Sequence, residues 1–182
     1  MRRRAIVGVM SVLAASALVV GMSVSVGGAS VSSAKAPPLC AGKTKAAAIK
    51  QIKVAYNHFL DGAKYPDPVA DKEPYIQNLS GKSVNADLVA QFEASAAENA
   101  AAAATTAVDI DKVICAKKGK KATVNFTLVI SGSRLEGLAA PGNAVLDGKT
   151  WKVGSLTLCN TTALGKPDVL ETEPCATIVL KG

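Results

Sequence analysis

The hydrophobic period of this chain changes once, near Thr106, and that change is the strongest constraint on its fold. Between residues 45 and 104 apolar side chains recur at helical spacing, and beyond Thr106 they alternate with polar ones at the period of a β-strand. Helices followed by a run of strands are typical of an α+β domain with an antiparallel sheet. We therefore expect two N-terminal helices packed on the apolar face of a sheet of about four strands.

The first predicted helix lies within residues 44–62, and Gly62 follows its end. Its apolar stripe contains Ile49, Ile52, Tyr56, Phe59 and Leu60. The three prolines of the segment 65–81 predict a loop with at most one short helical turn, near residues 72–79. The second predicted helix covers residues 86–106, with Asn85 as its cap. Its apolar stripe contains Leu88, Val89, Phe92, Ala96, Ala100 and Ala103, and Glu93, Ser95, Glu98 and Asn99 are predicted to lie off it.

Four alternating runs predict strands, at residues 107–116, 121–131, 143–147 and 149–159. The pair Asp147-Gly148 predicts a two-residue type I′ turn between the last two, so that the second arm of this hairpin ends on Cys159. Trp151, the only tryptophan, shares a face with Val153 and is predicted to pack in the core, with ligand stacking as the alternative. Residues 175–180 predict a last short strand or an extended arm.

The N-terminus predicts an export signal over residues 1–29, because MRRR precedes a long uncharged apolar run that closes in small residues. Cleavage is expected after Ala29 or Ala34, and an uncleaved membrane anchor is the alternative. Residues 30–42 then form a flexible linker and residues 43–182 a single secreted domain. Three of the arginines that contribute to the net charge of +7 lie in the signal, so the mature domain is less basic than the full chain. The remaining lysines are spread out without interleaved aromatics, so no nucleic-acid partner is expected.

Four cysteines follow the signal, and an even number in an exported chain predicts disulfides. Three pairings are possible; we favour Cys40 with Cys115 and Cys159 with Cys175. No cysteine spacing matches a metal site and His58 is the only histidine, so neither a metal nor a cofactor is expected.

The candidates for catalysis are few. Asp109 and Asp111 share one face of the first predicted strand, where they form either a carboxylate pair or, more simply, a solvated surface. His58 lies beside the stripe of the first helix, and a surface or half-buried imidazole is the simpler interpretation.

Several short motifs, FLDG, GNAV, DGKTWKV and TLC with a last cysteine, resemble the exported actinobacterial proteins related to the mycobacterial low-molecular-weight secreted antigen. The resemblance spans about residues 45–175. It implies secretion and a nuclear transport factor 2-like or cystatin-like fold, in which a curved sheet encloses a cone around a helix. It also places a disulfide at Cys159 and Cys175, and it brings no catalytic residues.

These observations predict a non-enzymatic domain that is secreted into the medium or stays in the cell envelope, where it can associate with the cell wall. The expected partner is a small hydrophobic molecule or an envelope protein. The protein itself is expected to be a monomer or a homodimer. It should contact the membrane only during export or through an uncleaved signal. Phe59, Phe126, Leu128 and Trp151 are the predicted pocket residues. The alternative is a small isomerase- or dehydratase-like enzyme with a carboxylate in the cone.

Overall fold

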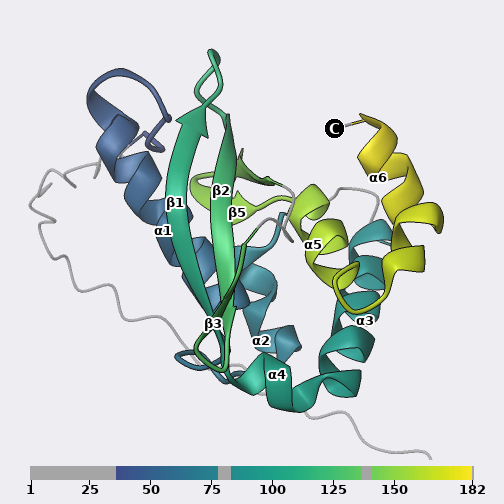
Figure 1. Ribbon diagram of the computed structural model, residues 1–182. Helices are drawn as coiled ribbons and strands as arrows, with labels where there is room; N and C mark the ends of the chain where they lie inside the picture. The colour runs from purple at the N-terminus through teal and green to yellow at the C-terminus, as the bar shows by residue number, and fades with distance from the viewer. Residues whose placement is uncertain (1–35, 78–82, 137–140, 182) are drawn as a thin grey trace, which may run out of the picture. The chain divides into compact units, whose positions relative to one another are not determined.

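A computed structural model describes residues 36–77, 83–136 and 141–181 of the chain (Figure 1). The predicted export signal at residues 1–29 lies outside these residues. The described part is an α+β domain in which a curled antiparallel sheet stands between helices. Its helical elements are η1 Gly42–Thr44, α1 Lys45–Leu60, α2 Val69–Lys72, η2 Glu73–Tyr75, α3 Ser83–Glu98, α4 Ala100–Ala104, α5 Ser155–Thr162, η3 Pro167–Glu171 and α6 Cys175–Lys181. Its strands are β1 Thr106–Cys115, β2 Lys121–Ile130, β3 Ser133–Leu135, β4 Gly142–Asp147 and β5 Thr150–Val153.

The sheet has the order β1-β2-β4-β5, and β3 pairs with β2 beside this path. Lys121–Val124 of β2 pairs with β4, whereas its other end, Leu128–Ile130, pairs with β3. Both partners therefore lie along the same edge of β2, at opposite ends, and β1 occupies the other edge. The β1–β2 register shifts at Asp111, between Ile110 and Lys112.

Helix α1 packs on this sheet, as its apolar stripe predicts. Ile52, Tyr56 and Phe59 are fully buried, and α1 contacts both β1 and β5. On β2, Val124, Phe126 and Leu128 are buried, while Thr123 before them is exposed and the two residues between them are half-buried, which agrees with the predicted alternation. Apolar area removed from water on this face is the main source of the domain's stability.

The hydroxyl of Tyr56 ties three elements together at the centre of the core. It donates to the backbone oxygen of Asn143 on β4 (3.0 Å) and lies 2.9 Å from Thr157 Oγ1 on α5. Gly142 must be glycine here, because a Cβ would come within 2.5 Å of the Tyr56 hydroxyl and 2.8 Å of Thr157 Oγ1. Burial raises the pKa of the Tyr56 phenol above its ordinary range, and the Thr157 hydrogen bond opposes part of that shift.

Tyr56 should make the fold sensitive to alkaline pH. Above about pH 10 the unfolded phenol loses its proton while the folded one keeps it, so the free energy of unfolding falls as pH rises. A Tyr56→Phe variant should lose about 1 kcal/mol at neutral pH, through the missing hydrogen bond, and then lose less than the wild type as pH rises. Urea titrations of both proteins across this range measure the difference; parallel profiles would refute the role given to the phenol.

The C-terminal third corrects two predictions. Strand β5 ends at Val153, and Cys159 lies on helix α5 instead of on a strand. Residues 175–180, predicted as a strand or an extended arm, belong to helix α6. Leu156 and Leu158 alternate with polar residues as they would in a strand. In the structure, however, the three consecutive residues Thr157, Leu158 and Cys159 are all fully buried, because α5 packs between α3 and β4. Tertiary burial has here overridden β-propensity.

The β4–β5 turn is displaced by one residue from its predicted place. Asp147 pairs with Thr150, so the two turn residues are Gly148 and Lys149. Gly148 has a φ of 61°, whereas Lys149 is not among the residues with positive φ. Positive φ at the first turn position alone is typical of a type II′ turn, not the predicted type I′ turn.

The second predicted helix also differs in its details. It begins at Ser83, so Asn85 lies inside α3 instead of capping it. It breaks at Asn99, whose φ of −116° and ψ of 34° separate α3 from α4. Ser95, predicted to lie off the apolar face, is buried with 8% of its surface exposed. The short helical turn predicted near residues 72–79 starts earlier, as α2 and η2 over residues 69–75.

Candidate functional site

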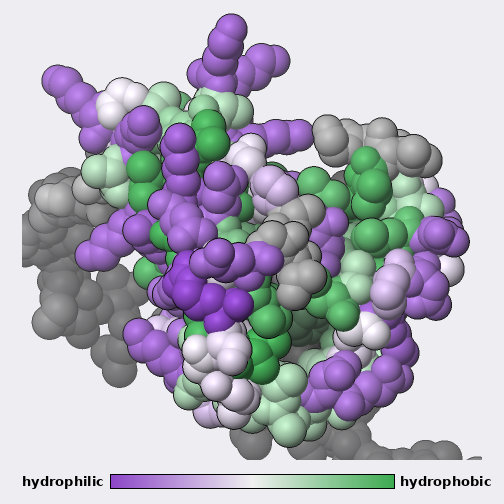
Figure 2. All heavy atoms as spheres, in the orientation of Figure 1, coloured by the Kyte–Doolittle hydropathy of each residue, from purple (hydrophilic) through white to green (hydrophobic). Residues whose placement is uncertain are grey.

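A cavity of about 610 Å³ lies between the sheet and the helices α1 to α5. On this face of the molecule hydrophobic side chains gather around a hollow (Figure 2). Its volume falls within the roughly 300–1,000 Å³ that small-molecule sites occupy. Its walls come from the end of α1, the 62–68 loop, α2, α3, α4, β1 to β3 and the turn after α5.

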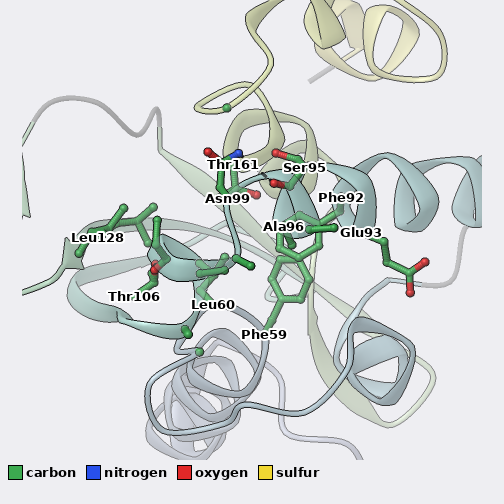
Figure 3. A pocket seen from close by; sticks show the side chains of 18 of the residues that line it. Phe59, Leu60, Phe92, Glu93, Ser95, Ala96, Asn99, Thr106, Leu128 and Thr161 are labelled. Atoms are coloured by element: carbon green, nitrogen blue, oxygen red, sulfur yellow. Dashed lines mark hydrogen bonds between the residues drawn. The ribbon is translucent and has the colours of Figure 1, made fainter.

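The aromatic part of the wall joins α1 to α3. Phe59 and Phe92 face each other with ring centroids 4.7 Å apart, and Leu60, Leu128 and Ile130 continue the apolar surface. Figure 3 shows Phe59 and Phe92 meeting beside Ala96. This part of the cavity suits hydrocarbon, since it offers almost no hydrogen-bonding groups to a ligand.

The alanine-rich stretch forms the wall that continues from Phe92 and explains why space remains. Six alanines of α3 and α4 line the cavity: Ala96, Ala97, Ala100, Ala102, Ala103 and Ala104. The backbone passes close to the loop after α1 here, and Ala63 N donates to Thr106 O at 3.1 Å. Side chains of a single carbon cannot fill the distance from this wall to the sheet, so a hollow is left where leucines would make a solid core.

Besides Tyr65 and Thr106, the polar residues of the lining fall into two groups. Ser95, Asn99 and Thr161 lie together on α3 and α5 (Figure 3). Asp67, Lys72 and Glu93 are the charged residues of the lining. Lys72 is 8% exposed and forms no salt bridge within the described part of the chain. Burial lowers the pKa of Lys72, and the nearby Asp67 and Asp61 oppose part of this effect.

The four predicted pocket residues separate into two pairs. Phe59 and Leu128 line the cavity. Phe126 instead packs edge-on against Tyr56, with ring centroids 5.5 Å apart, and Trp151 is buried with its Nε1 donating to Pro38 O at 2.7 Å. The sequence predicted that all four side chains point inward, but it did not indicate at which end of the sheet the cavity lies. Ser95, Asn99 and Thr161 were not predicted for the site, and the break at Asn99 is the feature that could have drawn attention to them.

None of the candidate catalytic side chains is itself a lining residue, although His58 packs on Tyr65, which is one. Asp109 and Asp111 are exposed and both form ion pairs with Arg134 of β3, the latter at 3.8 Å. His58 is half-buried between two tyrosines, 3.8 Å from the Tyr65 centroid and 4.4 Å from that of Tyr75. Within the described ranges no group of three or more His, Cys, Asp or Glu side chains could hold a metal ion.

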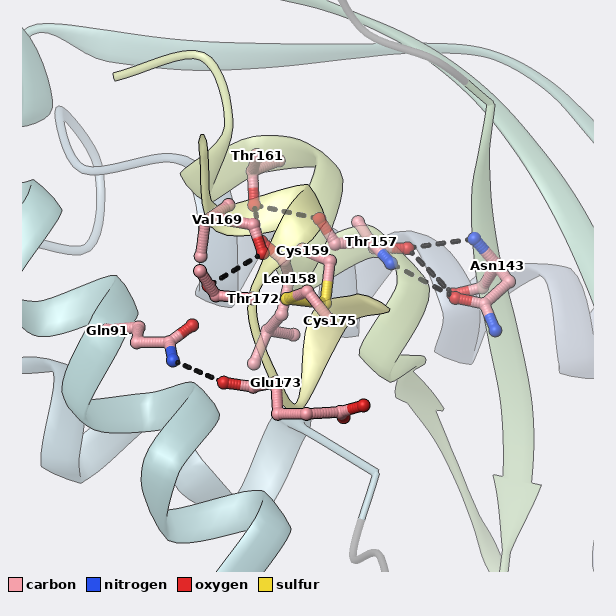
Figure 4. The surroundings of a disulfide bond; sticks show 10 residues. All are labelled: Gln91, Asn143, Thr157, Leu158, Cys159, Thr161, Val169, Thr172, Glu173 and Cys175. Carbon is pink, nitrogen blue, oxygen red and sulfur yellow. Dashed lines mark hydrogen bonds between the residues drawn. A yellow bond between two sulfur atoms is a disulfide. The ribbon is translucent and has the colours of Figure 1, made fainter. Parts of the chain in front are cut away.

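The described part of the domain contains two disulfides, with the pairings that the sequence favoured. Cys40 is joined to Cys115, which attaches the segment before α1 to the end of β1. Cys159 is joined to Cys175, which links α5 to α6 (Figure 4). Cys40 N also donates to Gly119 O at 2.8 Å, so part of the predicted 30–42 linker contacts the β1–β2 turn.

The class of protein that emerges is a small disulfide-braced α+β domain with a largely apolar cavity that opens to solvent. A family model described as the low molecular weight antigen MTB12, C-terminal domain, matches residues 45–168. The chain therefore belongs to this antigen family, as its resemblance indicated. Neither a curated protein nor a solved structure matches it. Among the residues described, no helix combines the length and apolar character needed to cross a membrane.

Proposed function

We propose that this protein is a secreted, non-enzymatic domain that binds a small hydrophobic ligand in the cavity. The observation that carries the proposal is the cavity of about 610 Å³ with Phe59, Phe92, Leu128 and an alanine wall around it. The cavity opens to solvent, and a largely apolar concavity of this volume is the usual form of a small-molecule site. A hollow of this volume therefore favours a binding function over a purely structural one.

Secretion is part of the proposal. Residues 1–29 act as the export signal, and the mature domain carries the two disulfides into an oxidising compartment. The family is described as an antigen, which agrees with a protein found outside the cell. The mature protein remains in the medium or associates with the cell wall.

The enzyme alternative receives no support from a specific contact. A general acid or base must reach its substrate within about 3 Å, and the best carboxylate pair, Asp109 and Asp111, instead faces Arg134 at the surface. The charged groups of the cavity lining are Asp67, Lys72 and Glu93. Within the described residues, these three side chains form no hydrogen bonds with one another that would orient them for catalysis.

A titration of the secreted protein with 1-decanol, followed by amide NMR spectra, tests the proposal. Saturable shifts should concentrate on α3, α4 and the Leu128 end of β2, because these segments line the cavity. Amides around Trp151 and Phe126 should move little, since those side chains pack elsewhere in the core. Non-saturating shifts scattered over the surface would refute the proposed function.

A further inference from the structure

We infer that the ligand is a single-chain amphiphile with an uncharged hydrogen-bonding head group, such as an alcohol or an ester, and that Ser95, Asn99 and Thr161 bind this head. The inference rests on the proposed function and adds the chemical class of ligand. The observation behind it is a hydroxyl without a protein partner, that of Ser95, next to two other neutral polar side chains in the cavity lining.

That hydroxyl belongs to Ser95, which is 8% exposed. Ser95 is a lining residue, and its Oγ forms no hydrogen bond within the described residues; it is not an enclosed atom but faces the open space of the cavity. Figure 3 places Ser95 beside Asn99 and Thr161, away from the ring of Phe59. Water can bind a hydroxyl that faces a cavity, and a ligand oxygen that displaces this water can take over its hydrogen bond. Ser95 Oγ is therefore available to a polar ligand atom in the cavity.

The two neighbours of Ser95 also have hydrogen-bonding capacity to spare. Asn99 Nδ2 donates to Ser95 O at 2.9 Å, which leaves its second N–H and its Oδ1 for a ligand. Thr161 donates its hydroxyl proton to the backbone of α5, at 2.8 Å from Thr157 O, so its oxygen can still accept. The cluster thus offers both donors and acceptors, which is what a hydroxyl or an ester needs.

Gly165 keeps this end of the cavity open. A Cβ at Gly165 would lie 2.9 Å from Ser95 Oγ and 3.0 Å from Asn99 Nδ2. Both distances are tighter than ordinary van der Waals contact, so a side chain here would occupy the space directly in front of the polar cluster. The position also provides a way to block the head-group site without removing any of its hydrogen-bonding groups.

The charges of the lining argue against an ionic head group. Lys72 is the one cation among the described lining residues, and two carboxylates, Asp67 and Glu93, share the lining with it. An anionic head would meet a lysine that already interacts with Asp67 and Asp61. A charged head of either sign placed at Ser95, Asn99 and Thr161 would exchange part of its hydration for three neutral groups, none of which carries an opposite charge. An uncharged head avoids both costs.

Three ligands with the same ten-carbon chain separate these cases: 1-decanol, decanoate and decyltrimethylammonium. Calorimetric titrations of the secreted protein, below the concentration at which each ligand forms micelles, should show 1-decanol binding at least about tenfold more tightly than either ion. Equal affinities, or a preference for an ion, would overturn the inference but leave the proposed function standing. Failure of all three to bind would overturn the proposed function itself.

Two variants locate the head group. Ser95→Ala should weaken 1-decanol binding about threefold to tenfold by removing one hydrogen bond, and Gly165→Ala should weaken it at least as much by crowding the cluster. Ser133→Ala is the matched control, because Ser133 lies exposed on β3 outside the cavity lining. Its affinity should equal that of the wild type. Unchanged 1-decanol affinity in both folded cluster variants, as verified by circular dichroism, would overturn the assignment of the head-group site.

Discussion

Replacing Cys159 and Cys175 together by alanine should lower the free energy of unfolding by about 2–5 kcal/mol, the usual loss for a native disulfide in a small secreted domain. Both residues are fully buried, and their bond is a covalent link between α5 and the short helix α6. A hydrogen bond also joins α3 to the segment before α6, since Gln91 Nε2 donates to Glu173 O at 3.2 Å, but it is much weaker than the covalent bond (Figure 4). Urea unfolding of the double variant and of the wild type measures the loss.

Hydrogen exchange distinguishes a local role of this disulfide from a general one. In the variant the amides of α6 should exchange faster while those of α1 stay protected, because α1 is held by the sheet and not by the Cys159–Cys175 bond. The Cys40→Ala and Cys115→Ala pair is the matched control, since it should leave α6 protected. A loss below about 1 kcal/mol for the Cys159 and Cys175 variant would contradict this account.

Ala96→Phe should abolish 1-decanol binding to within detection, a loss of at least about a hundredfold in affinity. Ala96 lies on α3 in the cavity wall, next to the facing rings of Phe59 and Phe92 (Figure 3). A phenyl ring at this position would fill space that the alanine leaves open. The folded state should lose little stability, because a cavity-filling apolar side chain adds contacts where there were none.

Ala90→Phe provides the comparison on the same helix. Ala90 is exposed on α3 and is not part of the cavity lining, so the same substitution there should leave 1-decanol binding unchanged. Calorimetric titration and thermal unfolding of both variants give the result. Retained binding in Ala96→Phe, with the fold intact, would mean that the ligand occupies some other surface.

The α+β class and the main elements could be predicted from local sequence patterns. The stripe of α1 and the alternation of β2 each depend on one apolar face, and both faces are buried as expected. Such patterns survive in the structure because neighbouring residues in one element share one environment. The family assignment rested on short motifs and is confirmed by the family model.

The region after Val153 could not be predicted in the same way. The alternation through Leu156 and Leu158 fits a strand, and only the packing of Thr157 against Asn143 and Tyr56 favours a helix there. Thr157 N donates to Asn143 Oδ1 at 3.2 Å, a contact between residues on different elements. Local propensity carries no information on such a contact.

A pocket was predicted, with Phe59 and Leu128 among its residues, but the part of its wall on α3 and α4 was not, for a related reason. The alanine-rich stretch was expected to pack closely on the sheet, because small side chains allow close approach. The break at Asn99 instead divides it into α3 and α4, whose alanines line a hollow. Ser95 then lies among buried residues although its helical position had suggested an exposed one. Whether small side chains give close packing or leave a cavity depends on where the backbone lies. Segments far away in the sequence, such as the turn after α5, determine that position.

The most direct test of the cavity as a binding site is a crystal structure of the protein purified from its native host, refined without any ligand placed in advance. The account predicts continuous electron density inside the cavity, running from the hydroxyl of Ser95 along the rings of Phe59 and Phe92 toward Leu128. Mass spectrometry of the same material should then give the mass of an uncharged amphiphile. A cavity closed by inward movement of α3 and α4, with their side chains packed on the sheet, would contradict the account.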